Sequence, residues 1–310
     1  MSYNPSQGIG TGRDGSGYSD RDLAIKVFSG EVLTAFDSAN IFLPLVQTRT
    51  INSGKSASFA VIGKYDTATS THVPGTDITP NLINAGERVI EIDDLKYASV
   101  FVDNFEEAMQ HYETRSQYSV EMGRRLAKTV DLAVIAQLDA CVAGTANAGD
   151  TNGGEGQPSA QTSITIDTVA AGTGNDAKGD AILSELFNAQ TALDEDDVPG
   201  DRYVVMSPKN YNRLVQSGAV HKDMTQGNNG GIDTGRIVQV AGHAILVSNN
   251  VGTNDIYMFT QNAVGVVKLL DIKSEVNYIP EKLGDLMTSS YAMGFGVLNN
   301  GCVVKLATND

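Results

Sequence analysis

The residues whose types and spacing could support chemistry begin with Ser53-Gly54-Lys55-Ser56. This run ends like the phosphate-binding loop of nucleotide hydrolases, in which backbone N–H groups and a lysine hold the phosphates. The first glycine of that loop would fall at position 49, which is Arg49, and the residues after Ser56 favour a strand although the loop must open a helix. The pattern therefore disfavours nucleotide binding at Lys55.

Histidines, cysteines and acidic runs offer no clearer site. The run Asp194-Glu195-Asp196-Asp197 lacks the glycine and the terminal glutamate of a calcium loop and is typical of a solvated helix end. No two of the four histidines have metal-ligand spacing; they are His72, His111, His221 and His243. The two cysteines, Cys141 and Cys302, are far apart in the sequence, as expected of buried thiols in a reducing cell. We expect no cofactor, no bound metal and no enzymatic activity.

Composition narrows the class of protein further. The chain has 310 residues, of which 41% are hydrophobic and 19% charged, and it shows neither a long apolar span nor a secretory signal pattern. Lys+Arg number 22 and Asp+Glu 37, so the formal net charge is −15. That sign is wrong for a protein that coats phosphates with cations. We expect no membrane span and no general affinity for nucleic acid.

The N-terminal part contains segments that lack a core of their own. Residues 1–19 are rich in glycine and predict a mobile arm, and a helix is predicted from Asp20 with apolar residues near helical spacing. Residues 48–63 predict two strands around a turn at 52–54, in the manner of a hairpin. This arm carries Arg49, Lys55 and Lys64, a local charge of about +3 in an acidic chain, which favours acidic groups of another copy as partners.

A long helix is predicted at residues 104–142. Its apolar stripe has spacings of three and four and includes Phe105, Met109, Tyr112 and Leu126. At 1.5 Å per residue this helix would be about 58 Å long, more than one compact globule can cover.

The remainder predicts an acidic glycine-rich loop followed by mixed α and β structure. The predicted elements are a loop at 144–179 with one β-like run at 163–169, a helix at 180–193, a strand at 202–206, a helix capped by Ser207-Pro208, a glycine-rich tip at 225–235, and strands at 243–247, 256–260, 263–270, 289–298 and 302–306. Because an isolated hairpin is marginal in water, and because the arm, hairpin and rod reach beyond their own core, contacts with other copies must complete them. The sequence therefore predicts an assembly protein.

Specific runs also resemble a known family. In chain order they are Lys26-Val27-Phe28-Ser29-Gly30-Glu31-Val32-Leu33-Thr34-Ala35-Phe36, Ser53-Gly54-Lys55-Ser56-Ala57 with Phe59, Pro74-Gly75, Ile92-Asp93 with Leu95, Glu107-Ala108-Met109-Gln110-His111-Tyr112 with Arg115-Ser116, Val198-Pro199 with Asp201-Arg202, Ala241-Gly242, and Tyr291-Ala292-Met293-Gly294 with Gly296 and Leu298. Together they resemble the major capsid proteins of T-seven-like short-tailed phages (autographiviruses), which have the HK-ninety-seven-type capsid fold.

The resemblance implies an α+β fold with named parts. They are an N-terminal arm at 1–47, an extended loop at 48–95, a peripheral domain at 96–179 with a spine helix at 104–142, an axial domain at 180–262, and a return to the peripheral sheet at 263–310. The implied contact residues are Arg49, Gly54, Lys55, Phe59 and Lys64 in the extended loop, Phe105, Met109, Tyr112, Arg115 and Leu126 on the spine helix, and Gly227, Asn228, Asn229 and Gly230 at the axial tip.

The resemblance also implies partners. The shell would consist of pentamers and hexamers, assemble on a scaffolding protein in the host bacterial cytoplasm, hold a portal at one vertex, and enclose double-stranded DNA without sequence-specific binding. Its subunits would associate without covalent crosslinks. Two alternatives are an encapsulin-like nanocompartment with protein cargo and, from a different class, a cytosolic α/β nucleotide hydrolase that uses Lys55.

Overall fold

The computed structural model describes residues 20–62, 71–72, 74–77, 85–92, 94–103, 105, 109, 115–144, 163–168, 174–217, 239–240 and 242–309, and shows an α+β protein of two compact units. The first unit comprises Met1–Asn40, Ile92–Asp131 and Lys268–Met293. The second comprises Ile41–Glu91, Leu132–Val267 and Gly294–Asp310. In the described part of the chain, no helix combines the length and apolar character needed to cross a membrane.

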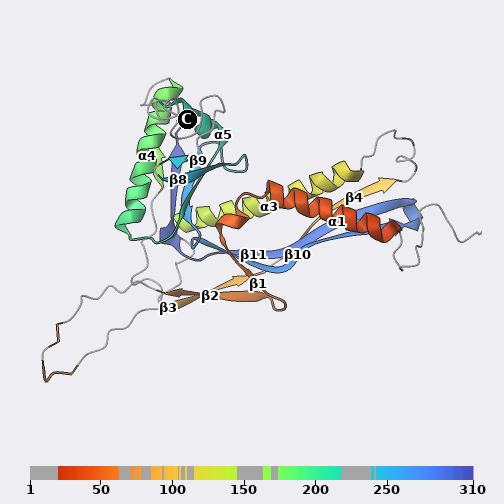
Figure 1. Ribbon diagram of the computed structural model, residues 1–310, viewed down its shortest axis with the longest axis horizontal. Coiled ribbons are helices and arrows are strands. Elements are labelled where there is room, and N and C mark those ends of the chain that lie inside the picture. The colour runs from red at the N-terminus through yellow and green to blue at the C-terminus, as the bar shows by residue number, and fades with distance from the viewer. Residues whose placement is uncertain are drawn as a thin grey trace, which may run out of the picture. The chain divides into compact units, whose positions relative to one another are not determined.

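The first unit packs two helices on one face of a sheet. These helices are α1 (Asp20–Ala39) and the first part of α3 (Arg115–Val142), which lie side by side in Figure 1. The four-stranded sheet has the order β1-β10-β11-β4, with β1 at Gln47–Thr50, β10 at Val264–Ile279, β11 at Gly284–Val297 and β4 at Leu95–Asp103, and most of β10, β11 and β4 belongs to this unit. Because strand side chains alternate between faces, Val102 reaches the core while Phe101 stays exposed. The core of this unit consists of Phe28, Val32, Val102, Met122 and Met287.

Helix α1 confirms the predicted helix from Asp20 and shows where its apolar face points. Phe28, Val32 and Phe36 are buried at spacings of four residues, whereas Leu33 lies outside this stripe and is exposed. Gly30 sits in the middle of the helix without breaking it.

The predicted hairpin at 48–63 is wrong in its pairing. The two runs do form strands, β1 (Gln47–Thr50) and β2 (Ser56–Ile62), but β2 pairs antiparallel with β3 (Ala85–Glu91) and β1 joins the four-stranded sheet next to β10. All four β1 side chains are exposed, so β1 offers no apolar partner to β2. Strand β3 does, because its buried Ile90 lies opposite Ala57.

The second unit is organised around a six-stranded sheet with α4 (Asn175–Glu195) and α5 (Pro208–Gln216) beside it (Figure 1). The sheet order is β5-β12-β9-β6-β8-β7, and its strands are β5 (Ile164–Ile166), β6 (Arg202–Met206), β7 (Gln239–Val240), β8 (His243–Val247), β9 (Asp255–Thr260) and β12 (Val303–Thr308). Strands β6 and β8 are parallel, and α5 follows β6 in the chain, as the predicted α/β alternation requires.

Helix α5 begins where the sequence predicts. Pro208 occupies its first turn, and the Ser207 hydroxyl accepts a hydrogen bond from the Asn210 backbone N–H at 3.4 Å. The same hydroxyl donates to the Thr253 carbonyl at 2.8 Å, so the cap is also tied to the turn before β9.

The predicted helix at 104–142 is confirmed over α3, which runs from Arg115 to Val142, and Phe105 and Met109 are also helical. The other residues between 104 and 114 lie outside the described part of the chain. At the predicted start, the Asp103 carboxylate accepts a hydrogen bond from the Phe105 backbone N–H at 2.7 Å. Phe105 and Met109 are 71% and 59% exposed, so these two side chains of the stripe are not buried within the chain. Spacing alone identifies a helical apolar face and does not say whether the same chain covers it.

Strands of residues 263–310 pair with strands of residues 95–179 in two different sheets, because β11 pairs with β4 and β12 pairs with β5. Strand β12 lies between β5 and β9 in the six-stranded sheet, where Val303, Val304 and Leu306 are buried. Parts of β10 and β11 do lie in the first unit with β4. The C-terminal segment is therefore divided between the two units.

Candidate functional site

The predicted contact residues of the extended loop have partners within the chain. Arg49 donates a hydrogen bond from Nη1 to the carbonyl of Ser58, and Gly54 adopts a φ of 105° in the turn before β2. Lys55 Nζ lies 3.5 Å from Glu91 Oε2 across the β2–β3 pair, with the two side chains 73% and 60% exposed. Lys64 lies outside the described residues.

These contacts revise the predicted contact set. The run that contains Lys55 leads into strand β2, not into a helix, so the local structure is not that of a phosphate-binding loop. An exposed ion pair such as Lys55–Glu91 contributes about 0–1 kcal/mol, which leaves both groups able to exchange partners. Phe59 is 7% exposed and packs inside its own chain, so it is not available to a neighbouring copy.

The predicted spine-helix residues have different surroundings. Arg115 Nη2 lies 3.0 Å from Asp285 Oδ2, which fixes the start of α3 to β11 within the first unit. Leu126 is buried, while Phe105 and Met109 are exposed. Tyr112 and the predicted axial tip, Gly227, Asn228, Asn229 and Gly230, lie outside the described residues.

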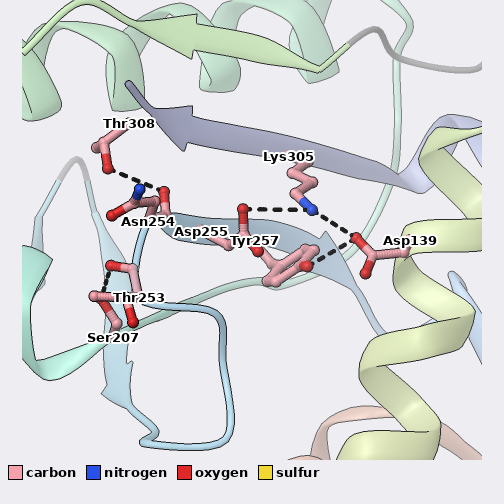
Figure 2. Close-up of polar contacts among 8 residues, drawn as sticks. All are labelled: Asp139, Ser207, Thr253, Asn254, Asp255, Tyr257, Lys305 and Thr308. Atoms are coloured by element: carbon pink, nitrogen blue, oxygen red, sulfur yellow. Dashed lines mark hydrogen bonds and ion pairs between the residues drawn. The ribbon is translucent and has the colours of Figure 1, made fainter. Parts of the chain in front are cut away.

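A polar cluster in the second unit involves Asp139, Asp255, Tyr257 and Lys305 (Figure 2). Asp139, near the end of α3, accepts hydrogen bonds from the Tyr257 hydroxyl and from Lys305 Nζ, each at 2.8 Å. Lys305 Nζ also lies 3.4 Å from Asp255 Oδ1 and 5.3 Å from the centre of the Tyr257 ring. The cluster thus joins α3 to β9 and β12. Nothing in the sequence spacing could have identified it.

Backbone contacts at the start of β9 complete this part of the unit. Figure 2 shows Thr308 donating from Oγ1 to the Asn254 carbonyl at 3.2 Å and Ser207 donating to the Thr253 carbonyl. The Thr308 backbone N–H donates to the same Asn254 carbonyl at 2.8 Å. These bonds hold the turn before β9 against the end of β12 and the cap of α5.

The electrostatics of the cluster favour a structural role. Burial by itself lowers the pKa of Lys305, but the hydrogen bond to Asp139 and the charges of Asp139 and Asp255 outweigh it and raise the pKa above its ordinary value. Burial, followed by the hydrogen bond to Asp139, raises the pKa of Tyr257. Both groups therefore keep their protons at neutral pH and cannot act there as a nucleophile or a general base.

The raised pKa values predict an alkaline loss of stability that Tyr257→Phe should reduce. Above about pH 10 an unfolded tyrosine loses its proton while buried Tyr257 keeps it, so the free energy of unfolding falls by about 1.4 kcal/mol per pH unit for each such group. Lys305 acts in the same direction above its unfolded pKa. Tyr257→Phe should cost about 1 kcal/mol at pH 7, from the lost hydrogen bond, and make the alkaline decline shallower.

Urea unfolding followed by circular dichroism from pH 7 to 11 measures this decline. Tyr291→Phe is the comparison, because burial alone raises the pKa of Tyr291, to about 12. Tyr291→Phe should make the alkaline decline in the free energy of unfolding as shallow as Tyr257→Phe does. Its loss of stability at pH 7 should be smaller. An alkaline slope that is the same in wild type and in Tyr257→Phe would contradict the assignment.

Among the other candidate reactive groups are two buried cysteines and a half-buried histidine. Burial raises the pKa of the Cys141 thiol to about 12 and also raises that of Cys302, so neither is a ready thiolate. Burial and the charge of Arg202 lower the pKa of His243. Among the residues that the structure describes, no three His, Cys, Asp or Glu side chains come together in a way that could hold a metal ion.

Comparison with known proteins agrees with the resemblance. Residues 58–256 match the family model described as "Gp10A-like: Major capsid protein". The chain is 36% identical over 213 residues to the major capsid protein of Enterobacteria phage T3, which covers 67% of this chain and 61% of that protein. It is 31% identical over 311 residues to the major capsid protein of Escherichia phage T7, covering 89% of each.

A solved structure extends the similarity to the whole chain. The capsid structure of the cyanophage P-SCSP1u superimposes with a TM-score of 0.72 at 34% sequence identity and covers 100% of both chains. The predicted α+β, HK-ninety-seven-type capsid fold is thereby confirmed. The chain belongs to the Gp10A-like family of phage major capsid proteins.

Proposed function

We propose that this chain is the principal subunit of the icosahedral shell that encloses the double-stranded DNA of a tailed phage, and that it catalyses no reaction. The observation that carries the proposal is the match over the full length of both chains to the cyanophage capsid structure. The polar cluster of the second unit supports it, since its lysine and tyrosine hold elements together and remain protonated.

The parts of the fold suit distinct assembly roles. We assign residues 1–47 to the N-terminal arm, 48–95 to an extended loop that lies over a neighbouring copy, 104–142 to the spine helix of the peripheral domain, and 180–262 to the axial domain. The pairing of β2 with β3 supports the second role, because a two-stranded sheet gains much of its stability from packing on other surfaces. Gly227, Asn228, Asn229 and Gly230 remain the proposed axial tip.

The same proposal includes partners and location. Copies would form pentamers and hexamers without covalent crosslinks, with a scaffolding protein during assembly in the host bacterial cytoplasm and a portal at one vertex of the virion. The names of the relatives support a capsid role, and the scaffolding protein and the portal are inferred as partners from the family.

Electron microscopy and sedimentation of the purified chain test the function. We expect closed shells with five-fold and six-fold clusters, and we expect particles from infected cells to contain DNA and one portal. Protein cargo in place of DNA would instead indicate a nanocompartment. A stable 32.8 kDa monomer that binds nucleotide would contradict the proposal and favour the hydrolase. Denaturing gels of shells should show only the monomer band.

The extended-loop contact makes a separate prediction. Arg49→Glu should lower the yield of shells several-fold, because we propose that this exposed cation meets carboxylates of a neighbouring copy. Arg49→Lys keeps the charge and is the matched control, with a yield close to that of wild type. Quantitative sedimentation gives the yield. If Arg49→Lys is impaired as much as Arg49→Glu, the contact to the Ser58 carbonyl matters and the charge does not.

A further inference from the structure

Three exposed cations follow one another on the surface of α3 in the first unit. Arg124, Arg125 and Lys128 occupy positions i, i+1 and i+4, and all three side chains are exposed. Glu121, one turn earlier, is the acidic residue on the same stripe. At 1.5 Å per residue the three cations lie within about 6 Å along the helix axis. We call Arg124, Arg125 and Lys128 the basic stripe.

The basic stripe differs from other exposed cations of this acidic chain. Lys55, Lys96 and Lys273 each have a carboxylate within 3.5 Å. The side chains of the basic stripe, by contrast, make no hydrogen bond or ion pair with any residue that the structure describes. Three positive charges within about one helical turn, against the single carboxylate of Glu121 on the same stripe, give this helix face a local charge opposite in sign to the net charge of −15.

A neighbouring groove helps to decide which anion would bind. This groove of about 450 Å³ lies between α1 and α3, with Arg124 at its lining. Its hydroxyl groups already donate to helix carbonyls, Thr34 to Gly30 at 2.8 Å and Ser38 to Ala35 at 3.1 Å, and Glu31 adds a carboxylate. The groove therefore presents hydrogen-bond acceptors and a negative charge, and both disfavour the binding of a small anion or an acidic peptide there. An anionic partner has to approach the open face of the basic stripe.

Double-stranded DNA has the charge distribution that fits an open stripe. It presents one negative charge per about 1.7 Å of helix axis, and arginine and lysine bind phosphate oxygens through charge-assisted hydrogen bonds. We propose that the basic stripe contacts the phosphate backbone of the enclosed DNA. This inference rests on the proposed function. The net charge of the whole chain argues against general nucleic-acid binding, but it does not describe the charge of this one helix face.

The test uses the full chain below the concentration at which shells form. Fluorescence anisotropy of a labelled 20-base-pair duplex gives the binding constant between 50 and 200 mM salt. Each phosphate contact contributes about 0.9 to the slope of log K against log salt, so the triple variant Arg124→Gln, Arg125→Gln, Lys128→Gln should lose up to about 2.7 of that slope. The matched control neutralises three cations of the same unit that have partners, Lys96, Lys273 and Lys282, and should lose less than a third as much.

Electron microscopy of the same variants separates this inference from the proposed function. A lost slope in the triple variant supports the DNA contact, whether or not its shells form. An unchanged slope in the triple variant overturns the DNA contact. If that variant also forms no shells while its circular dichroism spectrum is native, the partner of the basic stripe is instead the acidic surface of a second copy. If wild type forms no shells, the proposed function fails, and the slopes still report on the stripe.

Discussion

Replacement of Gly123 by valine should destabilise the first unit by about 3 kcal/mol and prevent shell formation. A Cβ at this position of α3 would lie 2.5 Å from the Val32 carbonyl oxygen and 2.9 Å from the Ala35 Cβ. The clashing atoms belong to the α1 backbone and to a side chain without rotamers, so they cannot turn away and the two helices must separate. Separation would expose Phe28 and Val32, which form the core with Met122.

Urea unfolding and sedimentation measure the two effects of Gly123→Val. The matched control is Gly30→Ala in α1, where an added Cβ meets no atom within 4 Å. Because alanine is the better helix former, this control should gain about 0.5–1 kcal/mol and still form shells. A Gly123→Val protein as stable as wild type would show that the close approach of α1 and α3 is not required.

Replacement of Gly179 by valine should have a comparable effect on the second unit. A Cβ on Gly179 of α4 would lie 2.1 Å from the Arg213 carbonyl oxygen and 3.0 Å from the Ser217 Cβ, at the end of α5. Both obstacles are close to the backbone of α5, so α5 must move away from α4, at a cost of about 3 kcal/mol. Leu214 and Leu186 would then lose part of their burial.

Hydrogen exchange with mass spectrometry locates the effect of Gly179→Val. Amides of α5 should exchange faster than in wild type, while those of α1 in the other unit should be unaffected. Ser184→Val, on the exposed face of α4, adds the same β-branched side chain without the clash and should change stability by less than about 0.5 kcal/mol. Unchanged protection of α5 in Gly179→Val would refute the close contact.

The sequence determined the features that depend on neighbouring residues. Ser207-Pro208 specifies the start of α5 because its cap and its first-turn proline are adjacent in the chain. Alternating or periodic apolar residues identify α1, β4, β6, β8 and most of the C-terminal strands, since burial on one face repeats every two or 3.6 residues. The ordered family motifs also predicted the capsid fold, which the cyanophage structure confirms.

Only the tertiary structure decided which distant elements meet. Strand β2 pairs with β3 and not with the nearer β1, because Ile90 supplies the buried partner that the exposed β1 lacks. Asp139, Tyr257 and Lys305 converge although more than a hundred residues separate the first two. Likewise, the three-dimensional arrangement shows that Lys55 has a carboxylate beside it, while Arg124 and Lys128 have none among the described residues. Local periodicity reports which face of an element is buried, and long-range packing chooses the partner.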